Sequence, residues 1–369
     1  ATTLAKCWSR SDQIRLFERC ACRKSCTGRS EVAVKAAVTV ERNRFAVREV
    51  PTPQPGSGQV LIKVACCGIC GSDLVNMKPT SPGYPLGVTP GHEWVGTITG
   101  LGEGVTRWKP GDRVVMRGYP DEEDPGPEMM AQFLQDPTIA LGVHPVVRAG
   151  GFAEYLIWPA IRLARVPDAV SDEEAALTDP LAVGLHGVRE SGLKLGDSVI
   201  IIGAGPIGLS ALLGARMAGA SRVYVTELME ARKSVAAELG ADRVYDPSKG
   251  DARLPLLEAT NGGADVVFDC VGSQATIQQS VDVVKTRGTV VLLGLSIEPV
   301  QIKPLVWFAK AVRYQVPEGG AVLQVLELLE QGRLNAAPMI TQVVPLEELQ
   351  QAFESLLQPT EQIKVLVRP

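Results

Sequence analysis

Hydrophobic and polar positions follow two different rhythms along this chain. From Lys35 onward, short runs that alternate between apolar and polar residues are separated by turn clusters such as Pro51-Thr-Pro-Gln-Pro-Gly56. Alternation with a period of two between clusters of Pro and Gly is typical of β-strands. The pattern predicts strands at residues 36–40, 45–49 and 60–64, and it indicates that this part of the chain is an all-β domain.

After about residue 180 the rhythm becomes strand, helix, strand. Apolar runs predict strands at 198–202, 222–226, 243–245, 265–269 and 289–293, and helical periodicity predicts helices at 207–218 and 230–239. This alternation is typical of a parallel sheet covered by helices on both faces. The tail adds predicted helices at 321–331 and 346–357 and a last strand at 364–367.

These changes divide the chain into three parts. Residues 1–34 carry seven Lys/Arg and three Asp/Glu and show no sustained period, so we expect a disordered arm. A metal site built on Cys20, Cys22 and Cys26, or a transit peptide, are the alternative interpretations of this arm. We assign residues 35–179 together with 316–369 to the β-rich domain, and residues 180–315 to the parallel-sheet domain.

Composition excludes several classes of protein. Of 369 residues, 45% are hydrophobic and 21% are charged, which is ordinary for a globular chain with two domain cores. The net charge of −4 gives no general attraction to nucleic acid or anionic lipid, so we expect neither as a partner. The uncharged stretch between Asp197 and Arg216 is interrupted by glycines and a proline, which predicts a buried strand and helix rather than a membrane span. Because residue 1 is not followed by an apolar run of signal-peptide length, we expect a cytoplasmic protein.

A glycine-rich turn follows the strand predicted at 198–202. Gly203-Ala-Gly205-Pro206-Ile207-Gly208 has the spacing of a dinucleotide-binding turn between a strand and a helix. The first glycine permits the tight turn, the second lets a pyrophosphate approach the backbone, and the third lets helix and strand pack closely. The helix N-terminus offers N–H groups to the phosphates. We therefore expect a dinucleotide at this turn.

Glu227 ends the next predicted strand, 19 residues after Gly208. A carboxylate at this place accepts hydrogen bonds from the ribose hydroxyls and repels a 2′-phosphate. NAD is therefore the expected cofactor. Arg232 is close enough in sequence to keep NADP as the alternative.

A second candidate site combines Gly68-Ile-Cys70-Gly-Ser72-Asp73 with Gly91-His92-Glu93. Cys70 and His92 are separated by 22 residues, a loose spacing that fits a metal site and equally a buried thiol near a core histidine. A catalytic zinc takes three N, S or O ligands and keeps a fourth position open, where it can act as a Lewis acid.

Together with the glycine turn, these motifs give the sequence a clear resemblance. From Lys35 to the C-terminus it resembles the zinc-dependent medium-chain dehydrogenases, the superfamily of alcohol, sorbitol and threonine dehydrogenases. Further matching motifs, in the expected order, are Gly102-Glu-Gly104-Val, Pro110-Gly-Asp112-Arg-Val, Gly150-Gly-Phe-Ala-Glu154-Tyr155, Asp179-Pro-Leu-Ala-Val and Phe268-Asp-Cys-Val-Gly272. The resemblance implies an α/β protein with a GroES-like β-barrel catalytic domain, a Rossmann doubly wound parallel sheet, and zinc between them.

The resemblance also assigns roles to residues of the second site. Cys70 and His92 match the family's zinc ligands, and Glu93 matches the neighbouring glutamate that either binds the metal or supports a ligand. Asp179 stands at the third-ligand position, where polyol dehydrogenases have a longer Glu; its alternative role is to begin a helix before a proline. Ser72 matches the hydroxyl that passes the substrate proton to the nicotinamide ribose, and Val75 stands where many relatives continue that relay with a histidine.

One expected departure from the family concerns a second metal. Many relatives hold a structural zinc in a lobe with four closely spaced cysteines, but this chain has no cysteine from 71 to 269. We therefore expect one catalytic zinc and no structural zinc. The residues between Arg117 and Gly150 instead predict a solvated loop with a short helix, which could border the substrate. Tyr84, Trp94 and Phe152 are candidate pocket residues, and each could equally belong to the core.

The function that these features predict is reversible hydride transfer between a secondary alcohol or polyol and NAD, with zinc polarising the substrate oxygen. The expected partners are a small alcohol or ketone substrate and copies of the same chain, in a homodimer or homotetramer as in relatives. Two alternatives remain open. One is a zinc-free quinone or enoyl reductase of the same superfamily, and the other is an inactive dinucleotide-binding structural or regulatory protein.

Overall fold

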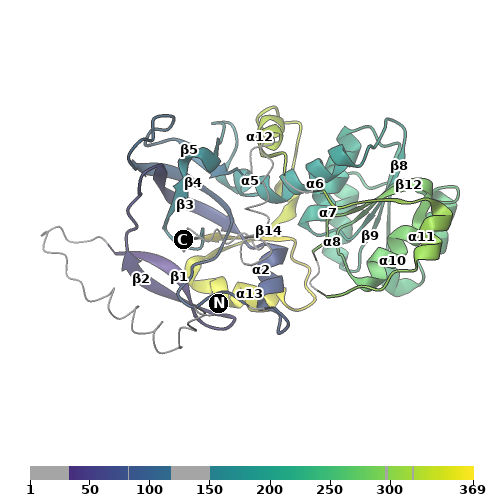
Figure 1. The fold of residues 1–369 in the computed structure, drawn as a ribbon, viewed down its shortest axis with the longest axis horizontal. Coiled ribbons are helices and arrows are strands. Elements are labelled where there is room, and N and C mark those ends of the chain that lie inside the picture. The colour runs from purple at the N-terminus through teal and green to yellow at the C-terminus, as the bar shows by residue number, and fades with distance from the viewer. Residues whose placement is uncertain (1–32, 82, 118–149, 296–297, 318–319) are drawn as a thin grey trace, which may run out of the picture.

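Two β-sheets at opposite ends of the molecule form the frame of the protein (Figure 1). The computed structural model describes residues 33–81, 83–117, 150–295, 298–317 and 320–369. Most of the arm at 1–34, its cysteines, and nearly all of the segment from Arg117 to Gly150 lie outside the described residues, so the expectations for them stay predictions.

The first sheet has seven strands in the order β14-β15-β3-β4-β5-β7, and β6 also pairs with β3. A separate hairpin of β1 and β2 packs beside it, joined by the bridge between Ala36 and Ala153. Apolar residues on the inner faces form one core that contains Trp94, Phe152 and Phe353. The strands are β1 Ala33–Glu41, β2 Arg44–Pro51, β3 Gln59–Gly68, β4 Glu93–Leu101, β5 Arg113–Met116, β6 Tyr155–Pro159, β7 Leu163–Arg165, β14 Ile340–Pro345 and β15 Lys364–Arg368.

The second sheet has six parallel strands in the order β10-β9-β8-β11-β12-β13. Its strands are β8 Ser198–Ile202, β9 Arg222–Thr226, β10 Arg243–Tyr245, β11 Ala264–Asp269, β12 Val284–Leu292 and β13 Arg313–Gln315. Val199 and Ile201 point into one core, while Ile200 and Ile202 point into another. The continuous apolar run of β8 is therefore explained by a strand that is buried on both faces.

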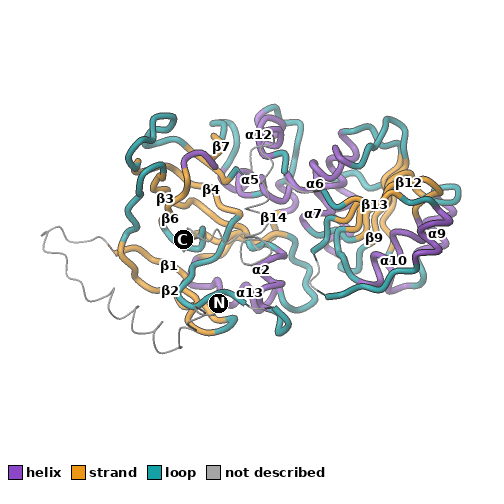
Figure 2. Tube along the Cα trace, in the orientation of Figure 1, coloured by secondary structure: helices purple, strands orange, loops and turns teal. Residues whose placement is uncertain are grey.

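Helices cover both faces of this parallel sheet (Figure 2). On the face of Val199, α7 Pro206–Met217 and α8 Glu230–Glu238 lie against the sheet, α6 Thr178–Glu190 packs on α7, and α12 Val322–Glu330 packs on α6. The face of Ile200 is covered by α9 Arg253–Ala259, α10 Gln274–Val283 and α11 Pro304–Lys310. The helices on the other lobe are α2 Gly71–Met77, α5 Asp172–Ala176 and α13 Leu349–Leu356.

The structure confirms most of the predicted elements and corrects some of their limits. Strands β8, β9 and β10 have the predicted bounds. Strand β1 begins at Ala33, so the last two residues assigned to the arm belong to a strand, and Val34 is buried. Helix α13 begins at Leu349 because a 3₁₀ turn occupies 346–348. The expected boundary at 179/180 falls inside α6, which therefore spans it.

Some elements were predicted only in part, and others were not predicted at all. Strand β12 begins at Val284, five residues before the predicted start, because its first half is an exposed polar segment. The α11–β13 pair and strand β14 are short and lack a clear period. In the described part of the chain, no helix has the length and apolar character that crossing a bilayer requires.

Candidate active site

The predicted metal ligands come together where β3 ends and β4 begins. Cys70 follows β3 and is the N-cap residue of α2, His92 directly precedes β4, and Glu93 is the first residue of β4. Antiparallel pairing sets Glu93 opposite Gly68, two residues before Cys70. The register of two neighbouring strands thus brings together residues that are 22 positions apart in the sequence.

Cys70, His92 and Glu93 offer ligand atoms that all lie within 4.8 Å of one another. Burial alone would lower the pKa of His92, but Cys70 and the carboxylates of Asp73 and Asp179 outweigh it and raise this pKa well above its ordinary value. His92 and Glu93 are buried, Cys70 is half-buried, and further carboxylates lie beside His92. One thiol, one imidazole and one carboxylate at this spacing fit Zn²⁺ in both ligand type and charge.

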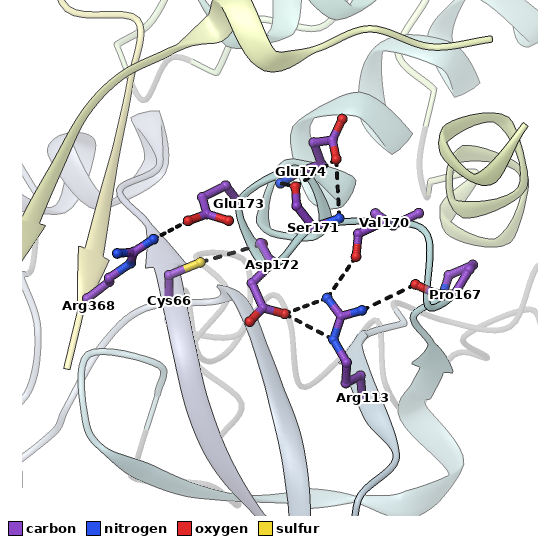
Figure 3. Close-up of polar contacts among 9 residues, drawn as sticks. All are labelled: Cys66, Arg113, Pro167, Val170, Ser171, Asp172, Glu173, Glu174 and Arg368. Atoms are coloured by element: carbon purple, nitrogen blue, oxygen red, sulfur yellow. Dashed lines mark hydrogen bonds and ion pairs between the residues drawn. The ribbon is translucent and has the colours of Figure 1, made fainter. Parts of the chain in front are cut away.

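Helix α5, which leads into the helix that carries Asp179, is anchored to the barrel (Figure 3). The Arg113 guanidinium of β5 donates to Asp172 Oδ1 at 2.5 Å and to the Val170 carbonyl at 2.8 Å. Ser171 caps α5 by accepting from the Glu174 N–H, while Arg368 of β15 pairs with Glu173 and the Cys66 thiol donates to the Asp172 carbonyl. Helix α5 continues through Leu177 into α6, whose first turn carries Asp179.

The structure places Asp179 beside the cluster but outside the set of three close ligands. Burial raises the pKa of its carboxyl; the charge of His92 opposes this rise, and that of Glu93 adds to it. Asp179 therefore interacts electrostatically with both His92 and Glu93. Asp179 also lies in the first turn of α6, directly before Pro180, so its alternative role near the helix start stays a prediction.

Lys364 is a site residue that the sequence analysis missed. It is only 1% exposed, and its Nζ lies 2.5 Å from Glu93 Oε2 and 3.0 Å from the Ile69 carbonyl oxygen. Gly68 leaves the room for this pair, because a Cβ at that position would come within 2.2 Å of Glu93 Oε2. A single lysine at the start of the apolar strand Lys364-Val-Leu-Val-Arg368 was the available sequence signal.

Asp73 is a second site residue that the sequence did not predict, because its motif assigns it no role. Its side chain is fully buried, and Oδ2 accepts the Cys70 N–H at 2.8 Å. Its Oδ1 accepts the Tyr84 hydroxyl and lies 3.8 Å from His92 Nδ1. Burial raises the pKa of Asp73, although His92 and Tyr84 oppose the rise.

The three candidate pocket residues prove to be core residues. Trp94, Phe152 and Tyr84 are all buried within the barrel core, where Trp94 packs edge-on against Trp158. The prediction of an apolar pocket from these rings is therefore not supported, because each of them fills the interior of the barrel.

Ser72 lies in the first turn of α2, two residues after Cys70. Its Oγ is buried and has no hydrogen-bond partner within the described protein. Buried hydroxyls in native structures usually have a partner, so this orphan hydroxyl indicates that a ligand completes it. Val75, which stands where many relatives have a histidine, is buried in the same helix.

The glycine turn has the geometry predicted for a dinucleotide. Gly203 has φ of +91°, and a Cβ at Gly208 would lie 1.8 Å from the Gly203 carbonyl oxygen. At Gly205, by contrast, a Cβ would meet nothing within 4 Å. The second glycine therefore faces open space beside the N-terminus of α7, where Pro206 is the first residue and Ile207 the second. That open space is what an approaching pyrophosphate needs.

Glu227 and Arg232 lie on either side of the start of α8. Glu227 accepts the Ala204 N–H at 2.8 Å and the Leu228 and Met229 N–H groups at 2.7 and 3.0 Å, so it links the end of β9 to the glycine turn. The Arg232 guanidinium donates twice to the Gln362 carbonyl.

Comparisons with known proteins agree with this geometry. Two family models match: the alcohol dehydrogenase GroES-like domain over residues 56–168 and the zinc-binding dehydrogenase over residues 206–325. (R,R)-butanediol dehydrogenase of Bacillus subtilis (strain 168) is 33% identical over 352 residues, 91% of this chain and 100% of that protein. Sorbitol dehydrogenase of Gallus gallus is 34% identical over 333 residues, 86% of this chain and 92% of that protein. A putative zinc-binding dehydrogenase from Sinorhizobium meliloti 1021, bound to NADP, superimposes with a TM-score of 0.77 at 31% identity, covering 92% of this chain and 100% of that one.

The chain belongs to the zinc-dependent medium-chain dehydrogenase/reductase superfamily. As a member, it is a zinc-dependent oxidoreductase of the alcohol and polyol dehydrogenase class that uses a nicotinamide cofactor. The predicted combination of a GroES-like domain with a parallel α/β sheet is confirmed. A zinc-free reductase and an inactive binding protein are not favoured by these relatives.

Proposed function

We propose that this chain oxidises a secondary alcohol or polyol with NAD at a single zinc held by Cys70, His92 and Glu93. The observation that carries the proposal is the cluster of these three ligand atoms within 4.8 Å, in which His92 and Glu93 are buried and Cys70 is half-buried. Relatives named for butanediol and sorbitol support a substrate with more than one hydroxyl group. The absence of cysteine from 71 to 269 supports one zinc per chain, since the four-cysteine lobe of relatives is missing.

Each residue of the site has a separate task in this proposal. Bound zinc supplies Lewis acidity toward an alcohol oxygen. Cys70, Glu93 and Asp179 supply negative charge around the metal position, and Asp73 orients His92. Ser72 Oγ, which lacks a partner in the described protein, is placed to accept the substrate proton and would pass it toward the ribose of a bound nicotinamide. Because Val75 cannot continue this relay, the proton would leave through water or another group.

NAD is the proposed cofactor because of the two residues near the start of α8. Glu227 places its carboxylate at the turn that would hold the pyrophosphate, and it repels a 2′-phosphate. Arg232, the candidate partner for such a phosphate, already donates to the Gln362 carbonyl. The Sinorhizobium meliloti neighbour, which is bound to NADP, keeps NADP as the alternative that the assay must include.

We further propose that two copies associate through the free edge of the parallel sheet. In the described residues, β13 has a neighbouring strand on one side only. Beside it, α11 exposes Leu305 and Phe308 at 78% and 83%. An unpaired edge next to apolar side chains is complementary to its own copy across a twofold axis.

A cytoplasmic setting fits the proposed zinc site, because a reducing compartment keeps the Cys70 thiol available for zinc.

A substrate screen on the zinc-loaded protein tests the function directly. NADH formation should be measured with diols, sugar alcohols, simple secondary alcohols and primary alcohols, before and after removal of metal by a chelator. We expect activity with a vicinal diol or polyol, lost on chelation and restored by zinc. NADPH-dependent reduction of a quinone or enone that survives chelation would favour a zinc-free reductase. Dinucleotide binding without turnover of any alcohol would favour the inactive binding protein.

A further inference from the structure

Tyr84 is a buried tyrosine whose hydroxyl points at the support of the metal site. It is 7% exposed, and its ring packs against Phe45 with 6.1 Å between the ring centroids. Its hydroxyl donates to Asp73 Oδ1. Packing explains the ring, but an apolar core position would be filled equally well by phenylalanine. The hydroxyl therefore needs its own explanation.

Asp73 interacts with two of the proposed metal ligands, Cys70 and His92. Oδ2 accepts the N–H of Cys70 at 2.8 Å, and Oδ1 lies 3.8 Å from Nδ1 of His92. A carboxylate held by one oxygen alone can rotate about its Cβ–Cγ bond, since that torsion is soft. The hydroxyl of Tyr84 holds the second oxygen, so it fixes the plane of the carboxylate and the direction in which Oδ1 faces His92.

Hydrogen bonds also hold the residues on either side of Pro82 in sequence, where the Gly83 N–H donates to Ser81 Oγ at 3.3 Å. The Arg42 guanidinium donates to the carbonyls of Pro79 and Ser81 at 2.8 and 2.5 Å. Ser81 Oγ in turn bonds Asn76 of α2 at 3.3 Å. Burial, together with the neighbouring Asp73 carboxylate, raises the pKa of Tyr84 well above its ordinary value. The phenol therefore stays protonated and acts as a donor throughout the working pH range.

We propose that Tyr84 is a positioning residue for zinc, acting through Asp73 on His92. This inference rests on the proposed zinc site. With Nδ1 of His92 facing Asp73, the other ring nitrogen, Nε2, is left for the metal. Partners that orient a ligating histidine typically change metal affinity about 10- to 100-fold when they are removed. Tyr84 acts one hydrogen bond further away, so its removal has a smaller effect of the same sign.

The test compares zinc release from the holoenzyme with release from Tyr84→Phe. The readout is the rate at which zinc is transferred to a coloured chelator, and the ligand-field absorption of cobalt-substituted protein reports the geometry of the site. We expect release about three to ten times faster in Tyr84→Phe, below the range for direct partners, with a shifted cobalt spectrum. Tyr224→Phe is the matched control, because it removes a buried tyrosine hydroxyl that donates to the Ala259 carbonyl in the other lobe. Its release rate should equal that of the wild type.

A double-mutant cycle separates positioning from a general loss of stability. In the Asp73→Asn background, Tyr84→Phe should add no further increase in release, because the path to His92 is already broken. Thermal unfolding of the wild type, the two single variants, the double variant and Tyr224→Phe shows whether a faster zinc release only reflects a lower melting temperature. Unchanged release in Tyr84→Phe, or the same acceleration with and without Asp73, would overturn the proposal. A wild type that binds no zinc would instead overturn the proposed function itself.

Discussion

The ammonium group of Lys364 and the carboxylate of Glu93 form an ion pair in which both side chains are almost completely buried. Lys364 begins the last strand, whereas Glu93 begins β4, and β3 lies between their two strands. The pair therefore links the C-terminal strand of the barrel to the metal ligands. It also places a lysine ammonium group directly against the carboxylate of the proposed metal site.

Lys364→Met should destabilise the zinc-free protein much more than the zinc-loaded protein. Removing one partner of a buried ion pair leaves the other charge uncompensated, at a cost of about 3–5 kcal/mol in the free energy of unfolding. Bound zinc compensates part of the Glu93 charge, so the loss should be smaller in the holoenzyme. Thermal unfolding with and without zinc checks this, with Lys364→Arg as the variant that keeps the charge. Equal destabilisation in both states would show that Lys364 acts independently of the metal.

Asp179→Asn should lower zinc occupancy and nearly abolish turnover while NADH binding is preserved. The carboxylate interacts with His92 and Glu93, so its loss weakens the attraction for a divalent cation. The cofactor turn at Gly203–Gly208 belongs to a different element and is unchanged. Metal analysis and fluorescence titration with NADH give the two readouts, with Cys70→Ser as the reference that loses the metal. Two zincs in the wild type, or a fully active Asp179→Asn enzyme, would contradict the proposed site.

Glu227→Ser should lower the ratio of kcat/KM for NAD to that for NADP. The structure adds a second effect, since Glu227 also accepts three backbone N–H groups at the turn. Hydrogen bonds to a charged group contribute about 1.5–3 kcal/mol each, so the variant should also bind both cofactors less tightly and melt earlier. Glu227→Gln keeps one acceptor oxygen and removes the charge, so it should change the ratio with less loss of stability. An unchanged ratio in both variants would mean that Glu227 does not face the ribose.

A chain that begins at Ala33 should match the full-length protein in activity and melting temperature. The strand β1 begins there, and Val34 pairs with Val50 and is buried. A chain that begins at Lys35 loses this side chain, whose burial contributes about 1.5–3 kcal/mol. Its melting temperature should therefore fall by a few degrees. If the Ala33 chain itself melts several degrees early, residues 1–32 contribute to stability.

Phe308→Glu should shift the protein from an associated state to a monomer. The side chain is exposed in the single chain, so the charge costs little in the monomer but opposes burial against a second copy. Light scattering after size-exclusion chromatography gives the mass, and Leu323→Glu on the exposed face of α12 is the control. A wild type that is monomeric at micromolar concentration would remove this proposal and leave the zinc site untouched.

The sequence predicted the elements whose pattern is strictly local. Strands β8, β9 and β10 were found because each is a run of apolar residues between polar turns. The first half of β12 was missed because Lys285, Thr286 and Arg287 are polar and exposed, and they lie at an irregularity where the pairing with β11 is interrupted. Strand β13 has only three residues, which is too short to show a period.

The candidate site shows the same difference between residues found in local motifs and residues joined by long-range contacts. Cys70, His92 and Glu93 stand in recognisable motifs, and the structure brings their ligand atoms together. The pairs that support them join residues that no local pattern connects. Tyr84 and Asp73 are 11 residues apart across a loop, and Lys364 and Glu93 are 271 residues apart across two strands. The first contact depends on how the loop folds back onto α2 and the second on the register of the sheet, and a single sequence reveals neither.

The interleaving of the barrel with the parallel sheet also sets an order of events during protein synthesis. Strands β14 and β15 complete the seven-stranded sheet, yet the ribosome makes them after the whole six-stranded sheet. Glu93 is translated 271 residues before Lys364, an interval on the order of tens of seconds at ordinary elongation rates. During this time the nascent chain carries three metal ligands without their positive counter-charge. Zinc captured early would therefore supply the positive charge that Lys364 provides once β15 has joined the sheet.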